Sequence, residues 1–518
     1  MRKIRLLLTC CMVLLFSVPT HAGQMVNVEY IHKLIEQQWG VWIPYNPAIV
    51  NPKIAANMEY LLGMVDITNK ELNRHTITGY QHTEYATKYA ADTDASIAAV
   101  SRLVKIEPKF FITTTDNTSD FEFSIGAAGT FMVDWGDGKK DKILRPHNTT
   151  LSTYTHTYDA PGKYEISIGG RATAYYYTVI SFSENLNISK IRGSLGEIFP
   201  AINTDSGPKL PEFANLFKNC TNLDGPIPEK LFAGIRGQPR AGMFASTFEG
   251  CTKLNGEIPA GLFGELVGVP QYRMFEKTFS GCKNISGKIP PGLFGELSGN
   301  PAGYMFSYTF NGCEKLSGEI PSGLFGDLTG APATGMFQFT FADCAGLTDA
   351  IPSGLFGNIS GNIAVSMFAY TFSGCVGLSG EIPSGLFGSP TGAPQYGMFD
   401  STFRGCYGLT GSIPSKLFGT PTGAPAAYMF DATFSGCHNL DGEIPADLFG
   451  NISGDAVTGM FFRTFYNCTN LTGPSARING TPLYEIWSDI PTDNWAVREC
   501  YYGDLQLSDY DSVPAEWR

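Results

Sequence analysis

Charged residues are scarce in this sequence. Asp, Glu, Lys and Arg together make up 16% of the 518 residues, and the formal net charge is −12. A protein that binds nucleic acid neutralises phosphates with a surface rich in Lys and Arg. Here 36 basic residues stand against 48 acidic ones, so no such surface dominates. The composition therefore argues against nucleic acid as a partner.

Catalytic and cofactor-binding motifs are also missing. The chain has 7 histidines, and residues 213–473 contain a single one, His438. There is no glycine-rich phosphate loop, no HExxH pair of zinc ligands and no GxSxG nucleophile turn. We therefore expect a non-catalytic protein with no cofactor and no metal. The alternative is an exported hydrolase or processing factor whose site lies in residues 23–200, which contain the other histidines of the mature chain.

Long apolar runs are absent except at the start of the chain. Basic residues at positions 2, 3 and 5 surround the beginning of an apolar run that ends at Val18, and the small residue Ala22 follows. This arrangement is typical of a cleaved secretory signal, which we expect at residues 1–22. No later stretch of about 18 apolar residues follows, so we expect no membrane span in the mature chain and a secreted or cell-surface location.

Two hydrophobic periodicities divide the next part of the chain. Residues 23–105 carry helical spacing, as in EYIHKLIEQQW, where Ile31, Leu34 and Ile35 form one stripe. We expect a small helical region there. From 106 to 185 the pattern changes to alternation, with FEFSI, TFMVDW and KYEISI placed between turn residues. This second pattern predicts a small β-sandwich.

Two phrases in the predicted sandwich carry a resemblance. VDWGDG begins at Val133, and HTYDAPGKYEISI begins at His156. Together they resemble the polycystic kidney disease (PKD) type of domain. The resemblance implies an immunoglobulin-like sandwich that serves as a spacer or contacts carbohydrate or protein. Asp134 and Asp137 have oxygens that could in principle bind a cation, but Asp-Gly in a hairpin is more often turn chemistry.

The second half of the chain is an internal repeat. Cysteine recurs every 31 residues, at positions 220, 251, 282, 313, 344, 375, 406, 437 and 468. A fixed period of this length is the signature of a solenoid, in which each unit buries its apolar residues against the next. Phe244 and Phe248 have the spacing of one helical face, and Leu254, Gly256 and Ile258 alternate with polar residues as in a strand. We expect each unit to be a strand, a turn and one or two short helices.

The recurring phrase TFxGCxxLxGxIP resembles the repeats of BspA-like bacterial leucine-rich repeat surface proteins. The resemblance covers residues 213–473, although this unit is longer and has a glycine such as Gly256 where that family more often has an aliphatic residue. It implies a secreted or surface-exposed binding protein used in adhesion or in contact with host or matrix.

The expected fold class is multidomain α+β. A leucine-rich-repeat-type solenoid of 31-residue units at 213–473 would follow the helical region and the immunoglobulin-like, PKD-like sandwich. We expect residues 186–212 to be a linker or N-terminal cap. Residues 474–518 depart from the repeat, with Pro474-Ser475 in place of the Ile-Pro step, and predict a C-terminal cap over the last unit.

The nine repeat cysteines, which we call the cysteine ladder, have three interpretations. Side chains in a parallel ladder point the same way into the core, whereas the Cβ vectors of a disulfide converge. This favours buried free thiols that pack as small apolar groups. Disulfides between some neighbours are an alternative, because adjacent rungs lie about 4.8 Å apart. A metal site is the third, although one cysteine per unit with no histidine makes a poor ligand set.

Variation among the repeats is concentrated in one loop, seen as ELVGVPQYR, DLTGAPATG and SPTGAPQYG. Four tyrosines stand there among few charges: Tyr272, Tyr304, Tyr396 and Tyr428. This composition suits contact with a glycan or a protein, and ordinary solvated loops are the alternative. We therefore expect an exported, monomeric binding protein whose solenoid contacts a protein or glycan ligand.

Overall fold

The computed structural model describes residues 76–77, 104–146, 150–204, 207–488, 490 and 495–518. The predicted signal at 1–22 and nearly all of the predicted helical region at 23–105 lie outside the described residues. Two short strands within that region, β1 (Thr76–Ile77) and β2 (Val104–Lys105), pair antiparallel. The architecture is therefore described from the β-sandwich onward.

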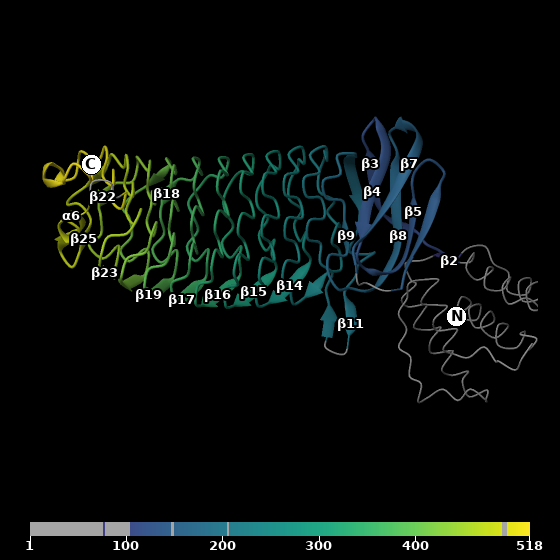
Figure 1. The fold of residues 1–518 in the computed structure, drawn as a ribbon, viewed down its shortest axis with the longest axis horizontal. Coiled ribbons are helices and arrows are strands. Elements are labelled where there is room, and N and C mark those ends of the chain that lie inside the picture. The colour runs from purple at the N-terminus through teal and green to yellow at the C-terminus, as the bar shows by residue number, and fades with distance from the viewer. Residues whose placement is uncertain (1–75, 78–103, 147–149, 205–206, 489, 491–494) are drawn as a thin grey trace, which may run out of the picture.

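A β-sandwich of two antiparallel sheets opens this part of the fold (Figure 1). The larger sheet has the order β10–β3–β8–β5–β6, and the smaller one has the order β7–β4–β9. Phe110 and Ile112 from one sheet and Phe121 and Phe123 from the other are buried between them, as the alternating pattern predicts. The strands are β3 (Pro108–Thr114), β4 (Thr118–Ile125), β5 (Ala128–Asp134), β6 (Lys140–Arg145), β7 (Ser152–Gly162), β8 (Glu165–Ala174), β9 (Ile180–Ser181) and β10 (Ile188–Gly193). The predicted sandwich is confirmed.

The sandwich and the solenoid share one hydrophobic core. The backbone N–H of Phe182, next to β9, donates to the Leu216 carbonyl (2.7 Å), and the Cys220 thiol donates to the Phe182 carbonyl (3.1 Å). The rings of Phe182 and Phe217 stack with centroids 5.4 Å apart. The chain around β9 thus acts as the first rung, and the sandwich covers that end of the solenoid. A hairpin of β11 (Ile202–Thr204) and β12 (Gly207–Lys209) projects near this junction (Figure 1).

The second half of the chain coils into a parallel β-solenoid of stacked rungs (Figure 1). One parallel sheet of 8 short strands runs along its side, and paired residues are 29 positions apart, as Arg236 with Glu265. The strands are β13 (Arg236–Gly237), β14 (Glu265–Gly268), β15 (Glu296–Gly299), β16 (Asp327–Gly330), β17 (Asn358–Asn362), β19 (Ser389–Gly392), β21 (Thr420–Gly423) and β23 (Asn451–Ile452). The predicted solenoid is confirmed, but its main sheet lies in the segment interpreted from sequence as a variable loop.

The strand expected around Leu254–Ile258 is reduced to short contacts. Gly256 and Ile285 pair as an isolated bridge, and several other rungs do the same. Two-residue strands form farther along the chain, where β18 (Gly380–Glu381) pairs with β20 (Leu409–Thr410) and β22 (Gly442–Glu443) pairs with β24 (Leu471–Thr472). The proline after each Ile ends the pairing, because it has no N–H to donate.

The helices expected in each unit are absent from the described rungs. Residues 242–251 form consecutive tight turns, which we call the turn ladder together with their counterparts in the other rungs. Every fourth residue is left-handed: φ is 64° at Gly242, 54° at Ser246 and 72° at Gly250. A right-handed α-helix excludes such angles. The expected α+β class is therefore not supported, because the described fold is mostly β and α6 (Leu483–Ile486) is its only α-helix.

Backbone hydrogen bonds explain the geometry of the turn ladder. Even-numbered residues from 242 to 250 donate their N–H to the next rung, as Phe244 to the Met274 carbonyl (2.8 Å) and Phe248 to the Thr278 carbonyl (2.9 Å). Odd-numbered residues donate within the rung, as Thr247 to Phe244 (3.3 Å). Half of the backbone donors of the ladder are therefore satisfied only by a neighbouring rung.

Phenylalanine columns and the cysteine column fill the interior. Phe244, Phe248 and Phe263 are fully buried, and like rings stack between rungs, with Phe248 and Phe279 at 5.6 Å between centroids. The ladder cysteines are free and buried, which matches the free-thiol interpretation. The Cys282 thiol donates to the Phe248 carbonyl of the preceding rung (3.0 Å), and its counterparts repeat this bond. Burial raises the pKa of this thiol, which makes it unreactive.

The predicted cap region closes the other end of the solenoid. The Trp487 indole N–H donates to the Gly454 carbonyl (2.8 Å), just past the last strand of the main sheet. The Phe465 N–H donates to the Cys500 carbonyl (2.9 Å), and the rings of Phe465 and Tyr501 stack at 5.7 Å. Residues 496–504 therefore form one more rung. The remaining elements are β25 (Arg477–Ile478), β26 (Thr481–Pro482), α6 and the 3-10 helix η2 (Tyr510–Ser512).

Two glycines of one rung provide a matched test of rung stacking. A Cβ at Gly295 (φ 80°) would overlap the Leu266 carbonyl of the preceding rung, whereas a Cβ at Gly292 (φ 66°) meets nothing within 4 Å. We expect Gly292→Ala to lower the free energy of unfolding by about 1 kcal/mol, because only left-handed strain is added. Gly295→Ala should cost about 3 kcal/mol, because the rungs must also separate. Chemical denaturation measures both, and equal losses would contradict the stacking argument.

The state of the cysteine ladder can be tested by thiol counting. The ladder thiols should react with a thiol reagent only after unfolding, and no reductant should be needed, because Cys282 and its counterparts are buried and unbridged. Labelling of the native protein without denaturant is the control that counts exposed thiols. Labelling that requires a reductant would show that disulfides form between rungs.

Candidate functional site

The four tyrosines predicted as a contact surface form two pairs on one side of the solenoid. Tyr272 and Tyr304 lie in neighbouring rungs with ring centroids 6.0 Å apart, and Tyr396 and Tyr428 lie 5.5 Å apart. Tyr272 is 49% exposed and Tyr396 is 55% exposed, whereas their partners are half-buried. Because the rungs stack in register, both pairs face the same side, and two intervening rungs separate them.

The local backbone explains why one tyrosine of each pair is half-buried. Tyr304 and Tyr428 occupy left-handed positions, with φ of 54° and 56°. Each ring lies against a glycine of the next rung, Gly335 or Gly459, where any side chain would collide with it. These two tyrosines therefore contribute to packing as well as to the surface. The other two are free to contact a ligand without loss of internal packing.

A cation lies beside the first tyrosine pair. The Arg273 guanidinium is 5.0 Å from the ring centroid of Tyr272 and 5.5 Å from that of Tyr304. It also forms an ion pair with Glu276 (3.4 Å). The positive charge favours the electron-rich ring faces, so this contact adds a cation to the surface beside the exposed ring of Tyr272.

Three more aromatic residues continue this side between the two pairs. The rings of Tyr308 and Phe339 stack at 4.4 Å, and those of Phe339 and Tyr370 stack at 4.3 Å, both nearly parallel. The Lys277 ammonium lies 5.6 Å from the Tyr308 centroid. Sequence reasoning missed this row because it followed the variable loop, although the same 31-residue step connects the three positions. We call the aromatic set the tyrosine face: Tyr272, Tyr304, Tyr308, Phe339, Tyr370, Tyr396 and Tyr428.

Two carboxyl groups stand within the tyrosine face. Asp400 and Asp431 occupy the same position in neighbouring rungs, both are half-buried, and Oδ1 of Asp400 is buried without a hydrogen-bond partner. Burial raises the pKa of Asp400 to about 6, against smaller lowering effects of Ser401, Tyr370 and Arg404. Burial and the charge of Asp400 raise the pKa of Asp431 to about 7. This part of the face therefore gains negative charge near neutral pH.

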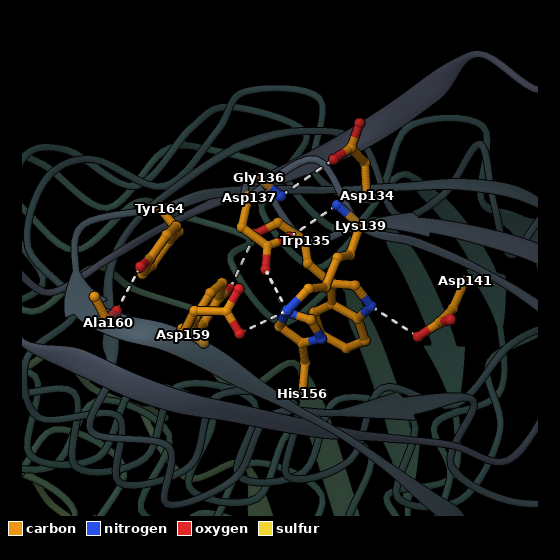
Figure 2. Close-up of polar contacts among 11 residues, drawn as sticks. Asp134, Trp135, Gly136, Asp137, Lys139, Asp141, His156, Asp159, Ala160 and Tyr164 are labelled. Carbon is orange, nitrogen blue, oxygen red and sulfur yellow. Dashed lines mark hydrogen bonds and ion pairs between the residues drawn. The ribbon is translucent and has the colours of Figure 1, made fainter.

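The WGDG segment of the sandwich forms a second polar cluster (Figure 2). Asp134 accepts a hydrogen bond from the Gly136 backbone N–H (3.1 Å), and Asp137 accepts one from the Lys139 backbone N–H (2.9 Å). Lys140 pairs with Asp134 (2.7 Å), and this contact lowers the pKa of that carboxyl. Both aspartates thus act in the way that turn chemistry predicts.

His156 completes this cluster from strand β7 of the other sheet. Its Nε2 lies 2.9 Å from Oδ2 of Asp137, and its ring stacks on Trp135 at 4.7 Å between centroids (Figure 2). Trp135 in turn donates its indole N–H to Asp141 (2.8 Å) and accepts from the Tyr158 hydroxyl (3.0 Å). Among the described residues, no group of three or more His, Cys, Asp and Glu is placed to hold a metal ion. The contacts give the cluster a structural role in holding the hairpin.

The single histidine of the repeats packs against its neighbours. His438 Nδ1 lies 2.7 Å from the Asn467 carbonyl oxygen, and its ring stacks on Tyr407 at 5.3 Å. Both contacts are with the adjoining rungs. Its position next to Cys437 in sequence does not pair it with that thiol, which donates to the Phe403 carbonyl inside the core (3.2 Å).

The Asp400–Asp431 pair predicts a pH dependence with a definite sign. Both carboxyls have a higher pKa in the folded chain than the ordinary 3.8, so their contribution is most favourable when they are protonated and is lost as pH rises towards 7. The wild type should lose unfolding free energy between about pH 4 and about pH 7. Asp431→Asn should lose less over the same range, by on the order of 1 kcal/mol once solvent screening is included. Asp327→Asn, at an exposed aspartate, is the control. Parallel curves for wild type and Asp431→Asn would contradict the prediction.

Comparisons with known proteins do not assign this chain to a family: no family model, no curated protein and no solved structure matches it. In the part of the chain that the structure describes, no helix is both long and apolar enough to cross a membrane.

Proposed function

We propose that this chain is an exported or cell-surface binding protein that contacts a protein or glycan ligand through the tyrosine face and does not turn it over. The observation that carries the proposal is the contrast between the inside and the outside of the rungs. The column of Phe248 keeps phenylalanine from position 217 to 465, and the column of Cys251 keeps cysteine from position 220 to 468. The outward positions of the same turns vary between small, aromatic and charged residues.

The chemistry of the tyrosine face suits this role. Tyrosine offers a large apolar ring with a hydroxyl that can donate or accept a hydrogen bond, and it loses little conformational entropy on binding. Tyr272 and Tyr396 expose about half of their surface at separate points of a rigid array. Two contact points on one rigid side favour an extended ligand or a protein surface over a small molecule.

The resemblances found in the sequence lead to the same expectation. The BspA-like phrase implies an exported protein used in adhesion or in contact with host or matrix, and the PKD-like phrases imply a non-catalytic contact module. Both remain part of this proposal, as do the predicted secretory signal, the absence of catalysis and the monomeric state. The described fold itself is a parallel solenoid behind an antiparallel sandwich.

Binding can be tested with glycan and protein probes. The purified mature chain would be applied to a glycan microarray and to immobilised mucin, collagen and fibronectin. We expect Tyr272→Ala with Tyr396→Ala to weaken the strongest signal at least tenfold with an almost unchanged melting temperature, because both side chains are exposed. Tyr407→Ala is the matched control, since that tyrosine is 48% exposed and lies outside the tyrosine face. Equal binding by wild type and the double variant would refute this surface.

Tyr304 and Tyr428, which are half-buried, should behave differently from the exposed Tyr272 and Tyr396. Tyr304→Ala and Tyr428→Ala remove rings that pack on Gly335 and Gly459, so we expect a loss of about 1–2 kcal/mol in unfolding free energy besides any effect on binding. Thermal denaturation separates the two classes. A melting temperature unchanged in these variants would show that the rings are not part of the packing.

A further inference from the structure

The last rung carries a carboxyl group at the position where the other rungs carry a thiol. Asp504 donates its backbone N–H to the Tyr501 carbonyl (3.1 Å), as Cys468 does to Phe465 (3.0 Å). The Phe465 N–H, in turn, donates to the Cys500 carbonyl (2.9 Å), which fixes the register of the two rungs. By this register the sequence CYYGD at 500–504 replaces TFYNC at 464–468. Asp504 is therefore the next member of the cysteine column.

The surroundings of Asp504 do not suit a carboxylate. Its side chain has no exposed surface, and neither carboxyl oxygen has a hydrogen-bond partner. A buried ionised carboxylate without a donor or a counter-charge is very costly. The repeat cysteines at this position act as hydrogen-bond donors. The Cys468 thiol, for example, donates to the Phe434 carbonyl of the preceding rung (3.1 Å). By the register of the rungs, the group that corresponds to the Phe434 carbonyl for Asp504 is the Phe465 carbonyl. A carboxyl group can donate a hydrogen bond to a carbonyl only when it is protonated.

The titratable neighbours offer no compensating charge. Cys468, Cys500 and Tyr501 lie near Asp504 and are buried; burial is the main cause that raises their pKa values, and the Asp504 charge adds to it. Among the described residues, no Lys, Arg or His changes the pKa of Asp504. Burial raises its pKa well above the ordinary value, and the nearby backbone of Cys468 offsets only part of this rise.

We propose that Asp504 is held as a neutral carboxylic acid at neutral pH, that its O–H takes the place of the thiol as a donor to the preceding rung, and that its ionisation loosens the C-terminal end of the solenoid. The end of the array is thus a pH-dependent lock, closed in the protonated state. This inference concerns the terminal rung alone and does not rest on the tyrosine face or on any ligand.

The stability test compares the wild type with two variants of the same position. Asp504→Asn has nearly the same shape, stays neutral and keeps a donor, and Asp504→Cys restores the ladder residue. Because the folded wild type binds a proton that the unfolded chain releases, its melting temperature should fall relative to both variants as pH rises from about 4 to about 8. We expect the gap to widen by several degrees over this range. A gap that stays constant for both variants would overturn the proposal.

Two further measurements detect the protonated carboxyl of Asp504 and the opening of the terminal rung. In infrared spectra at about pH 8, where Asp400 and Asp431 are ionised, the wild type should keep a carbonyl band of a buried carboxylic acid that both variants lack. Mass spectrometry after thiol labelling at the same pH should show Cys468 and Cys500 reacting several-fold faster in the wild type than in Asp504→Asn, because Asp504 ionises in the transiently open state and so favours opening in the wild type only. Absence of the acid band, or equal labelling rates, would count against the lock.

Discussion

The structure depends on the sharing of backbone donors between rungs. In the turn ladder every second N–H is donated to the next rung, as from Phe244 to Met274, and the residues between them close turns within their own rung. A single unit therefore cannot satisfy its own backbone, whatever apolar residues it contains. The columns of phenylalanine and cysteine add burial to this arrangement. The result is a core that continues from the sandwich to the last rung.

The same constraint determines which side chains reach the surface. Left-handed residues recur every four positions, and at these points Tyr304, Tyr308 and Tyr428 turn towards the solvent side of the ladder. Neighbouring rungs place like positions next to each other, so single aromatic residues become stacked rows. The stacked row of Tyr308, Phe339 and Tyr370 is therefore a product of rung register. The acidic pair of Asp400 and Asp431 arises in the same way, which explains why two carboxyls share one half-buried environment.

The sequence predicted the solenoid, the sandwich and the inward cysteines, because each follows from a period that the chain repeats many times. It did not predict that the described rungs lack helices. The four-residue spacing of Phe244 and Phe248 fits a helical face, but it fits a chain of four-residue turns equally well. The deciding factor is the N–H of Phe244, which bonds to a residue 30 positions later. Such a partner is not visible in local spacing, and Ser246 or Phe339 gives no sign that its φ is positive.

For the candidate site as well, the positions of residues in the unit could be predicted from the sequence, but their contacts could not. The sequence located Tyr272, Tyr304, Tyr396 and Tyr428 in one part of the unit, but it could not tell which rings lie on a glycine of the next rung. It missed the stacked row at Phe339, since one aromatic residue per rung has no meaning until the rungs are placed in register. The same register makes Asp504 unusual. Cysteine is a small apolar side chain that can still donate to a carbonyl, so it suits every internal rung. A carboxyl group can replace it in that role only in its protonated form.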